Sequence, residues 1–276
     1  MLAKKFQDCK TKIKYPCFVQ PKLNGVRMMA YRGELQSRDE HLWGKAVLRD
    51  LRKELARVPD HYVLDGELYV HGWSLQQINS VGSVNRTNDH KDAGKLEYHV
   101  FDMLNVNFLE LSFEERWYEL CNLRDSLWNT SKIKFVTTSM VETEQQAEQL
   151  YWYFKHSCKF EGMMYRDRLA PYGLLYNCSN QENRWSCLLK RKDFLDEDCM
   201  IVDVKEGTGK FIGKVGSLVL RFPGNGKLFN AGSGLSDMQR ETYMDKPPIG
   251  FKARINYEML SDTGVPLKPV IDCIYE

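Results

Sequence analysis

The sequence predicts an α+β protein of two domains, and three observations support this. The chain of 276 residues is long enough for one large domain or two smaller ones, each with its own core. As far as residue 194, segments with a helical spacing of apolar residues are mixed with short apolar strands. Beyond it, five short strands are separated by glycine-rich turns, with one helix among them. We therefore expect a mixed domain over residues 1–194 and a mostly β domain over residues 195–276.

The composition excludes several classes of protein. Hydrophobic residues at 43% and charged residues at 28% are typical of a soluble protein, and no apolar run approaches the roughly 20 residues of a membrane span. The net charge is +2, because 37 acidic residues nearly cancel 39 basic ones, so a nucleic-acid surface would have to be a local patch. The eight cysteines form no C-x-x-C pair and fit scattered reduced thiols. No signal peptide is evident, so we expect a cytoplasmic protein.

One lysine stands at the end of an apolar run. Residues 17–20 and 26–31 are predicted to be short strands, so Lys22 would project from the turn between them. Gly25 would let the backbone approach a ligand closely. An ordinary hairpin with a solvated lysine gives the same pattern, since Asn-Gly is the strongest short hairpin signal. The function of Lys22 therefore has to be judged with the rest of the chain.

The other elements of the larger domain follow from apolar spacing and capping signals. The expected helices lie within residues 45–57 and 73–84, from Ser112 towards residue 128, and from Thr143 to about residue 159. The expected strands cover residues 62–70, 96–104, 161–166 and 184–192. Residues 82–95 form a polar loop, and residues 193–198 an acidic hinge.

Several charged side chains occur in strands that otherwise appear buried. Asp65 and Glu67 interrupt one apolar strand, which is costly unless a cation or a hydrogen-bond donor meets them. Alternation along the last strand puts Lys190 and Lys192 on one face. Two ammonium groups on one face can stabilise a phosphate that carries developing charge, although a basic edge strand would look the same. Glu161, at the mouth of a strand, is a further candidate.

Five segments in a fixed order complete a known set of motifs. They are residues 22–27, 65–68, 101–104, 161–164 and 189–192. The chain resembles the small ATP-dependent DNA ligases of viruses and some bacteria, which belong to the covalent nucleotidyltransferase superfamily, from about Tyr15 to its C-terminus. RNA ligases and mRNA capping guanylyltransferases share the ancestral motifs and remain alternatives. So does a nucleic-acid-binding relative without catalysis.

The resemblance implies both a fold and a reaction. The larger domain would be a nucleotidyltransferase (adenylation) domain of ATP-grasp-like antiparallel sheets with helices, and the smaller one a β-barrel of the OB type, which also fits five short strands. Lys22 would attack the α-phosphorus of ATP, and AMP would pass from the lysine to the 5′-phosphate of a nick. The 3′-hydroxyl would then seal the strand. Lys22, Lys190 and Lys192 are the catalytic residues that this implies.

The resemblance also implies a nucleotide site. Its residues are Gln20, Lys22, Arg27, Arg38, Glu67, Phe101, Glu161, Lys190 and Lys192. Phe101 would stack on adenine, and Glu67 and Glu161 would place Mg²⁺ or another divalent cation. Gln20 shares a strand face with Lys22 and would read the adenine edge, but an amide pairs with donors and acceptors, so it does not decide between ATP and GTP. The partner would be nicked duplex DNA and not a membrane, the protein would be a monomer, and a viral chain would act inside the host cell.

Two positions depart from the family pattern. Asn24 stands where the family usually has aspartate, so we expect it to orient the lysine loop by hydrogen bonds. Near the C-terminus, Lys268 is a weak substitute for the basic motif that assists the departure of pyrophosphate in many relatives. Residues 207–214 and the basic first fourteen residues are candidate contacts to a nucleic-acid backbone, although a solvated helical end explains the latter equally well.

Overall fold

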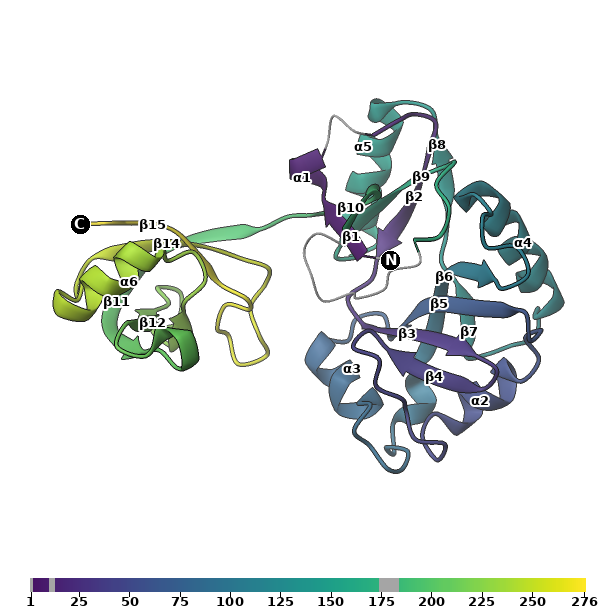
Figure 1. Cartoon of the computed structure of the whole chain (residues 1–276), viewed down its shortest axis with the longest axis horizontal. Helices are drawn as coiled ribbons and strands as arrows, with labels where there is room; N and C mark the ends of the chain where they lie inside the picture. The colour runs from purple at the N-terminus through teal and green to yellow at the C-terminus, as the bar shows by residue number, and fades with distance from the viewer. Residues whose placement is uncertain (1, 10–12, 174–183) are drawn as a thin grey trace. The chain divides into compact units, whose positions relative to one another are not determined.

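The computed structural model describes residues 2–9, 13–173 and 184–276 of the chain. The chain divides into two compact units, Met1–Lys192 and Asp193–Glu276 (Figure 1). Separate clusters of buried apolar side chains fill each unit, two in the larger and one in the smaller. In the described part of the chain, no helix has the length and apolar character needed to cross a membrane.

The first sheet of the larger unit has the strand order β1-β10-β9-β2-β8. These strands are Leu2–Lys5 (β1), Cys17–Lys22 (β2), Ser139–Val141 (β8), Gly162–Asp167 (β9) and Arg184–Lys192 (β10). All neighbours are antiparallel except β1 and β10, which run parallel. The helices that go with this sheet are α1 (Phe6–Cys9) and α5 (Glu144–Trp152), the latter continued by a π-helical turn (Tyr153–Ser157).

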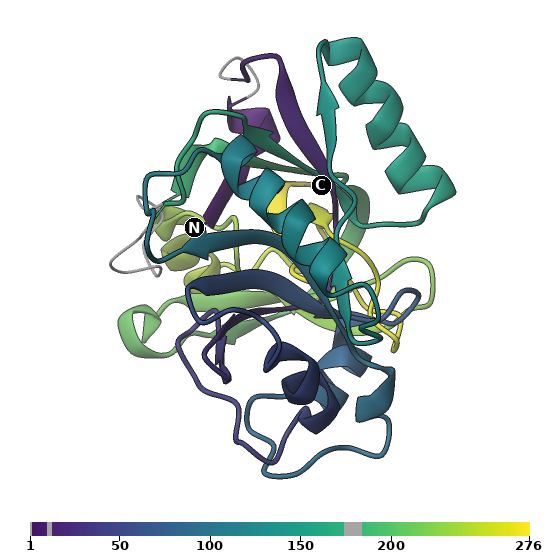
Figure 2. The same ribbon diagram turned by 90° about the vertical axis from the view of Figure 1, so that its right-hand side faces the viewer.

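The second sheet has the order β4-β3-β5-β6-β7. Its strands are Val26–Tyr31 (β3), Glu34–Ser37 (β4), Tyr62–Tyr69 (β5), Glu97–Asn105 (β6) and Ile133–Phe135 (β7), of which β6 and β7 are parallel. The accompanying helices are α2 (Arg49–Leu55), α3 (Leu75–Gly82), the 3₁₀ turn Ala93–Lys95 and α4 (Phe113–Ser126). Helix α4 packs against β6 (Figure 2), and its N-cap, Ser112, forms the predicted capping box with Glu115.

The structure corrects two expectations for the larger unit. Strands β2 and β3 do not form a hairpin, because they belong to different sheets, and residues 23–25 lead the chain from one to the other. Lys22 is accordingly the last residue of β2 and not part of a hairpin turn. Residues 2–9 form strand β1 and then the short helix α1, in which Phe6 and Cys9 are buried, so this segment is not a solvated helical end; Lys10 and Lys12 of the expected basic arm lie outside the described residues.

The smaller unit is one antiparallel sheet of order β13-β12-β11-β14-β15. Its elements are Leu195–Glu206 (β11), a 3₁₀ turn at Gly209–Phe211, Val215–Arg221 (β12), Leu228–Ala231 (β13), Asp237–Asp245 (α6), Lys252–Tyr257 (β14) and Val270–Tyr275 (β15). Over residues 193–276 the sheet does not close by a ladder, since one bridge, Ser233 to Val270, links its two ends. The predicted helix begins at its capping residue Ser236, as expected.

A buried arginine holds α6 to this sheet. Arg240 is 6% exposed and donates to the carbonyls of Val215 and Gly216 at 2.8 Å each, and to that of Gly232. Because a guanidinium carries five donors, one side chain can bind several backbone acceptors at once. The expected acidic hinge is shorter than predicted, because β11 already begins at Leu195.

The two units differ in core and, over the residues that the structure describes, share no strand, so we expect residues 1–194 alone to fold. A purified fragment ending at Phe194 should unfold in one cooperative thermal transition and keep far-UV circular dichroism typical of mixed α and β structure. A fragment that shows no cooperative transition, while the full chain unfolds cooperatively under the same conditions, would contradict the expectation.

Candidate active site

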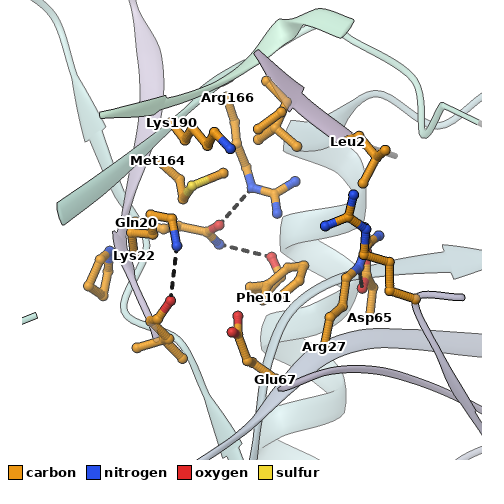
Figure 3. A pocket seen from close by; sticks show the side chains of 15 residues that line it. Leu2, Gln20, Lys22, Arg27, Asp65, Glu67, Phe101, Met164, Arg166 and Lys190 are labelled. Carbon is orange, nitrogen blue, oxygen red and sulfur yellow. Dashed lines mark hydrogen bonds and ion pairs between the residues drawn. The ribbon is translucent and has the colours of Figure 1, made fainter. Parts of the chain in front are cut away.

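A cavity of about 190 Å³ lies between the two sheets of the larger unit (Figure 3). That is more than ten times the ~15 Å³ that a single water molecule requires. Both sheets contribute to its wall, and the predicted residues Gln20, Lys22, Arg27, Arg38, Glu67, Phe101 and Lys190 all line it. The remaining lining residues are Leu2, Ala3, Pro21, Leu23, Asp65, Met164, Arg166 and Leu188. Seven of the nine expected nucleotide-site residues therefore meet at one cavity.

Of the other two, Glu161 contacts Lys22 at the end of β2, and Lys192 contacts Glu161. Glu161 Oε2 contacts Lys22 Nζ, and Glu161 Oε1 lies 3.2 Å from Lys192 Nζ. All three side chains are mostly buried, at 20%, 10% and 9% exposure for Lys22, Glu161 and Lys192. One carboxylate between two ammonium groups balances part of their charge in a place where isolated ions would be costly.

Strand register brings Lys22 and Glu161 together. In the antiparallel pair β2–β9, Lys22 lies opposite Gly162, and the Glu161 amide donates to the Lys22 carbonyl at 3.1 Å. A Cβ on Gly162 would come within 2.1 Å of the carbonyl oxygen of Arg191 on β10. Glycine is therefore required where β9 passes β10 beside the lysine, because any larger residue would push the strands apart.

Glu67 lies on β5, where it faces the loop after Lys22. It accepts a 2.8 Å hydrogen bond from the Gly25 amide, and a Cβ on Gly25 would meet the Leu68 carbonyl at 2.2 Å. Burial raises the pKa of Glu67 to about 7, with a smaller contribution from the neighbouring Glu161. Lys22 and the Gly25 amide act on this pKa in the opposite direction. The carboxyl of Glu67 is thus balanced between its two protonation states near neutral pH.

Arg27 is held by Asp65 on the neighbouring strand. Its Nε and Nη2 donate to the two carboxylate oxygens at 2.8 and 2.6 Å, and Tyr172 donates to Asp65 Oδ2 at 2.8 Å. A two-point contact of this kind fixes both the position and the plane of a guanidinium. Asp65 thus orients Arg27 at the cavity wall (Figure 3).

Gln20 and Phe101 form a further part of the cavity wall. The Gln20 side chain is 1% exposed, and its amide nitrogen donates to the Phe101 carbonyl at 2.9 Å. Met164 on β9 is paired with Gln20 on one side and Lys190 on the other, so these three residues lie across adjacent strands. Arg38 directly follows β4 and is exposed at the cavity edge.

Sequence reasoning missed the buried ion cluster behind this wall. Asp102 is 1% exposed and receives hydrogen bonds from Arg116 Nε at 2.8 Å and Arg166 Nη1 at 2.6 Å. Burial alone would raise the pKa of Asp102, but the two guanidinium groups keep it below its usual value. Side chains alternate along β9, so Arg166 lies on the same face as Met164, and this alternation could have identified Arg166 as a residue of the cavity wall. The contact between Arg166 and Asp102 has no signal in the sequence.

Comparison with known proteins gives these residues a family. A model described as the ATP-dependent DNA ligase domain matches residues 1–190, more than half of the chain. The chain belongs to the ATP-dependent DNA ligase family. A second model, the DNA ligase OB-like domain, matches residues 206–274 of this ligase. The predicted fold class is thereby confirmed, with the qualification that the sheet of the smaller unit is OB-like without a closed ladder.

Individual relatives agree with the family models. A DNA ligase of Haemophilus influenzae is 26% identical over 209 residues, which cover 74% of this ligase and 69% of the relative. A solved Lig E DNA ligase, described as binding DNA with a minimal scaffold, is 23% identical with a TM-score of 0.82, over 99% of this chain and 98% of that one. The Chlorella virus DNA ligase-adenylate is 21% identical with a TM-score of 0.55, over 100% and 97%. These structures show that the fold is shared.

The expected DNA ligase function is confirmed by these findings, and none of them favours the RNA ligase, capping or non-catalytic alternatives. Use of ATP follows from the family. In the smaller unit, Lys268 Nζ lies 3.1 Å from Glu258 Oε2, with a side chain that is 69% exposed. Its proposed role towards pyrophosphate remains a prediction.

The residues present also fit a divalent cation. Among the described residues no group of three or more His, Cys, Asp or Glu side chains could hold a metal ion. Glu67 and Glu161 nevertheless lie close enough for Glu161 to raise the pKa of Glu67. Mg²⁺ usually takes one or two protein carboxylates together with water and the phosphates of its substrate, so Glu67 and Glu161 would be sufficient as the protein ligands.

The raised pKa of Glu67 predicts how the stability of the ligase depends on pH. In the unfolded chain this carboxyl titrates near pH ~4.3, whereas in the folded ligase its pKa is about 7. Between these values the folded state retains a proton that the unfolded chain has lost, so this contribution to stability is full below pH ~4 and falls as pH rises to about 7. At pH 8 the folded ligase carries a charged, poorly solvated carboxylate.

We therefore compare the unfolding free energy of Glu67→Gln with that of wild type at two pH values. The variant's value relative to wild type should be higher at pH 8 than at pH 5 by about 1 to 2 kcal/mol. Urea unfolding of both proteins at the two pH values measures the difference. Glu34→Gln, at a carboxylate with 48% exposure, is the control and should show little change. An equal effect of Glu67→Gln at both pH values would contradict the assignment.

Proposed function

We propose that this ligase seals nicks in duplex DNA through AMP bound covalently to Lys22. The observation that supports this is the position of Lys22: its amine lies at a cavity between two sheets, in contact with Glu161. A protonated amine has no lone pair, so Lys22 must lose a proton before it attacks, and Glu161 is in direct contact with that proton. Family membership supports the covalent lysyl-adenylate route.

In the first step, a bond forms between Lys22 Nζ and the α-phosphorus of ATP, and the bond from that phosphorus to pyrophosphate breaks. Lys190 and Lys192 compensate the charge that develops on the phosphate oxygens. Arg27, already oriented by Asp65, and Arg38 at the cavity edge bind the ribose and phosphates. Phe101 stacks on the adenine, and Gln20 contacts its edge.

In the later steps, a 5′-phosphate oxygen at the nick attacks the phosphorus of the lysyl-AMP and frees the lysine. The 3′-hydroxyl then attacks the activated 5′-phosphate, forms the new phosphodiester bond and releases AMP. Glu67 and Glu161 would hold a divalent cation, Mg²⁺ or a similar ion, whose chemistry is to neutralise phosphate charge when it is bound. We further propose that the protein acts as a monomer in the cytoplasm, or inside the host cell if its source is viral.

The two units would divide the work. Residues 1–194 hold every residue assigned to the chemistry, which makes them the adenylation domain. Residues 195–276, the OB-like domain, would add contacts to the backbone of the duplex, and their charged turn at 207–214 is one candidate surface. Such contacts contribute the salt-dependent part of DNA affinity, because each neutralised phosphate releases counterions.

A labelling experiment tests the role of Lys22. Incubation with ATP labelled at the α-phosphate and Mg²⁺ should leave covalent label that stays on the wild-type protein in a denaturing gel, and Lys22→Ala should lose more than about 99% of it, since a methyl group cannot form the bond to phosphorus. Lys45→Ala is the matched control, because the Lys45 side chain is 88% exposed. Wild-type labelling of Lys22→Ala would contradict the proposal.

A second experiment tests the division of work. The fragment 1–194 should seal nicked duplex DNA at least about tenfold more slowly than the full chain, because it lacks the backbone contacts of the OB-like domain. Binding to the nick should be compared at two salt concentrations, where the full chain is expected to show the steeper dependence. A folded fragment that binds and seals as well as the full chain would leave the second unit without a role in the reaction.

A further inference from the structure

The Gln20 amide has its orientation fixed by groups of opposite polarity. Its oxygen accepts a 2.6 Å hydrogen bond from Arg166 Nε, and its nitrogen donates to the Phe101 carbonyl at 2.9 Å and to Thr138 Oγ1 at 2.8 Å. A guanidinium can only donate and a carbonyl can only accept, so the assignment of oxygen and nitrogen follows from the partners. The Thr138 hydroxyl donates its hydrogen to the Val136 carbonyl at 3.1 Å. It can therefore only accept a hydrogen bond from Gln20.

This arrangement leaves one kind of group for a ligand. Both hydrogens of the amide nitrogen are used, whereas the oxygen has two lone pairs and receives one hydrogen bond from the residues that the structure describes. Gln20 lines the cavity together with Phe101 (Figure 3). The amide therefore offers an acceptor, and not a donor, to a base that stacks there.

Arg166 is itself held rigidly. It is 4% exposed, and its Nη1 donates to Asp102 Oδ2 at 2.6 Å. Arg116 holds the same carboxylate at 2.8 and 3.2 Å and also donates to the carbonyls of Leu111 and Ala170 at 2.7 and 3.1 Å. If the Gln20 amide flipped, its N–H would face the Nε–H of a guanidinium that cannot move away.

We propose that Arg166 is a positioning residue that fixes the polarity of Gln20, so that the site selects a purine with a hydrogen-bond donor at C6 over one with an acceptor there. The inference rests on the proposed function, in which the adenine of ATP lies against Gln20 and Phe101. Adenine has an amino group at C6, which can donate a hydrogen bond to the Gln20 oxygen. Hypoxanthine and guanine have an oxygen at that position, which would face the Gln20 oxygen.

The test compares labelling of Lys22 from ATP and from ITP, both labelled at the α-phosphate. ITP differs from ATP in its C6 oxygen and N1 hydrogen and lacks the extra amino group of GTP. Lys22 of the wild type should be labelled at least about tenfold more efficiently from ATP than from ITP. One hydrogen bond, formed with ATP and replaced by repulsion with ITP, can supply this ratio. Arg166→Met should lower this ratio at least about threefold, mainly through the concentration of ATP required, because Gln20 loses the donor that fixes it.

A double substitution separates positioning from a general structural effect. Gln20→Met should bring the ratio of ATP to ITP near one, and Arg166→Met added to Gln20→Met should change it no further, because Arg166 acts through Gln20. If Arg166 only supported the fold, its substitution would slow charging with both nucleotides equally and leave the ratio unchanged. That result would overturn the inference.

Two milder variants keep the test informative if Arg166→Met does not fold. Arg166→Lys retains a cation beside Asp102 and should preserve more of the ratio than Arg166→Met. Thr138→Val removes one acceptor of the Gln20 amide without disturbing the buried ions and should lower the ratio in the same direction. An unchanged ratio in Thr138→Val would count against the inference. A wild type that charges equally with both nucleotides would overturn it and leave the proposed function standing, whereas a wild type that takes label from neither would overturn the function itself.

Discussion

The pairing of β2 with β9 is the constraint on which the site depends. Its register places Lys22 opposite Gly162 and therefore next to Glu161, and it places Gln20 opposite Met164, two residues before Arg166. The side chains of a strand alternate with a period of two, so a slip of one residue would turn both Lys22 and Gln20 away from the cavity. One ladder thus sets the position of the proposed nucleophile and of the residue that we propose faces the base.

The wall of the cavity is unusual in the number of charges it buries. Asp102, Arg116 and Arg166 are all at most 4% exposed, and such ions are tolerated only when partners compensate for lost solvation. Here the compensation is nearly complete, since Asp102 receives both guanidinium groups and Arg116 also bonds two backbone carbonyls. A cluster of this kind contributes rigidity to the groups in front of it more than net stability, which is the quality needed to hold the amide of Gln20 in one orientation.

The sequence predicted the elements with strong local signals and the residues that belong to motifs. The capped helices at Ser112 and Ser236 begin as expected, and Lys22, Glu67 and Glu161 could be named because each stands in an ordered set. The N-terminal strand β1 was missed, because a four-residue strand whose partner is β10 has no local periodicity. Contacts that depend on three-dimensional register, such as that of Arg166 with Asp102, have no signature in the local sequence.

The joint between the two units has a mechanical consequence. Strand β10 ends at Lys192, β11 begins at Leu195, and residues 193 and 194 alone connect them. Two extended residues span only about 7 Å, so the connection has almost no slack. Any reorientation of the smaller unit has to be absorbed by a few backbone torsions directly beside Lys192, whose ammonium lies 3.2 Å from Glu161. Any such reorientation would therefore act on the same short piece of chain as the ion pair of Lys192 with Glu161.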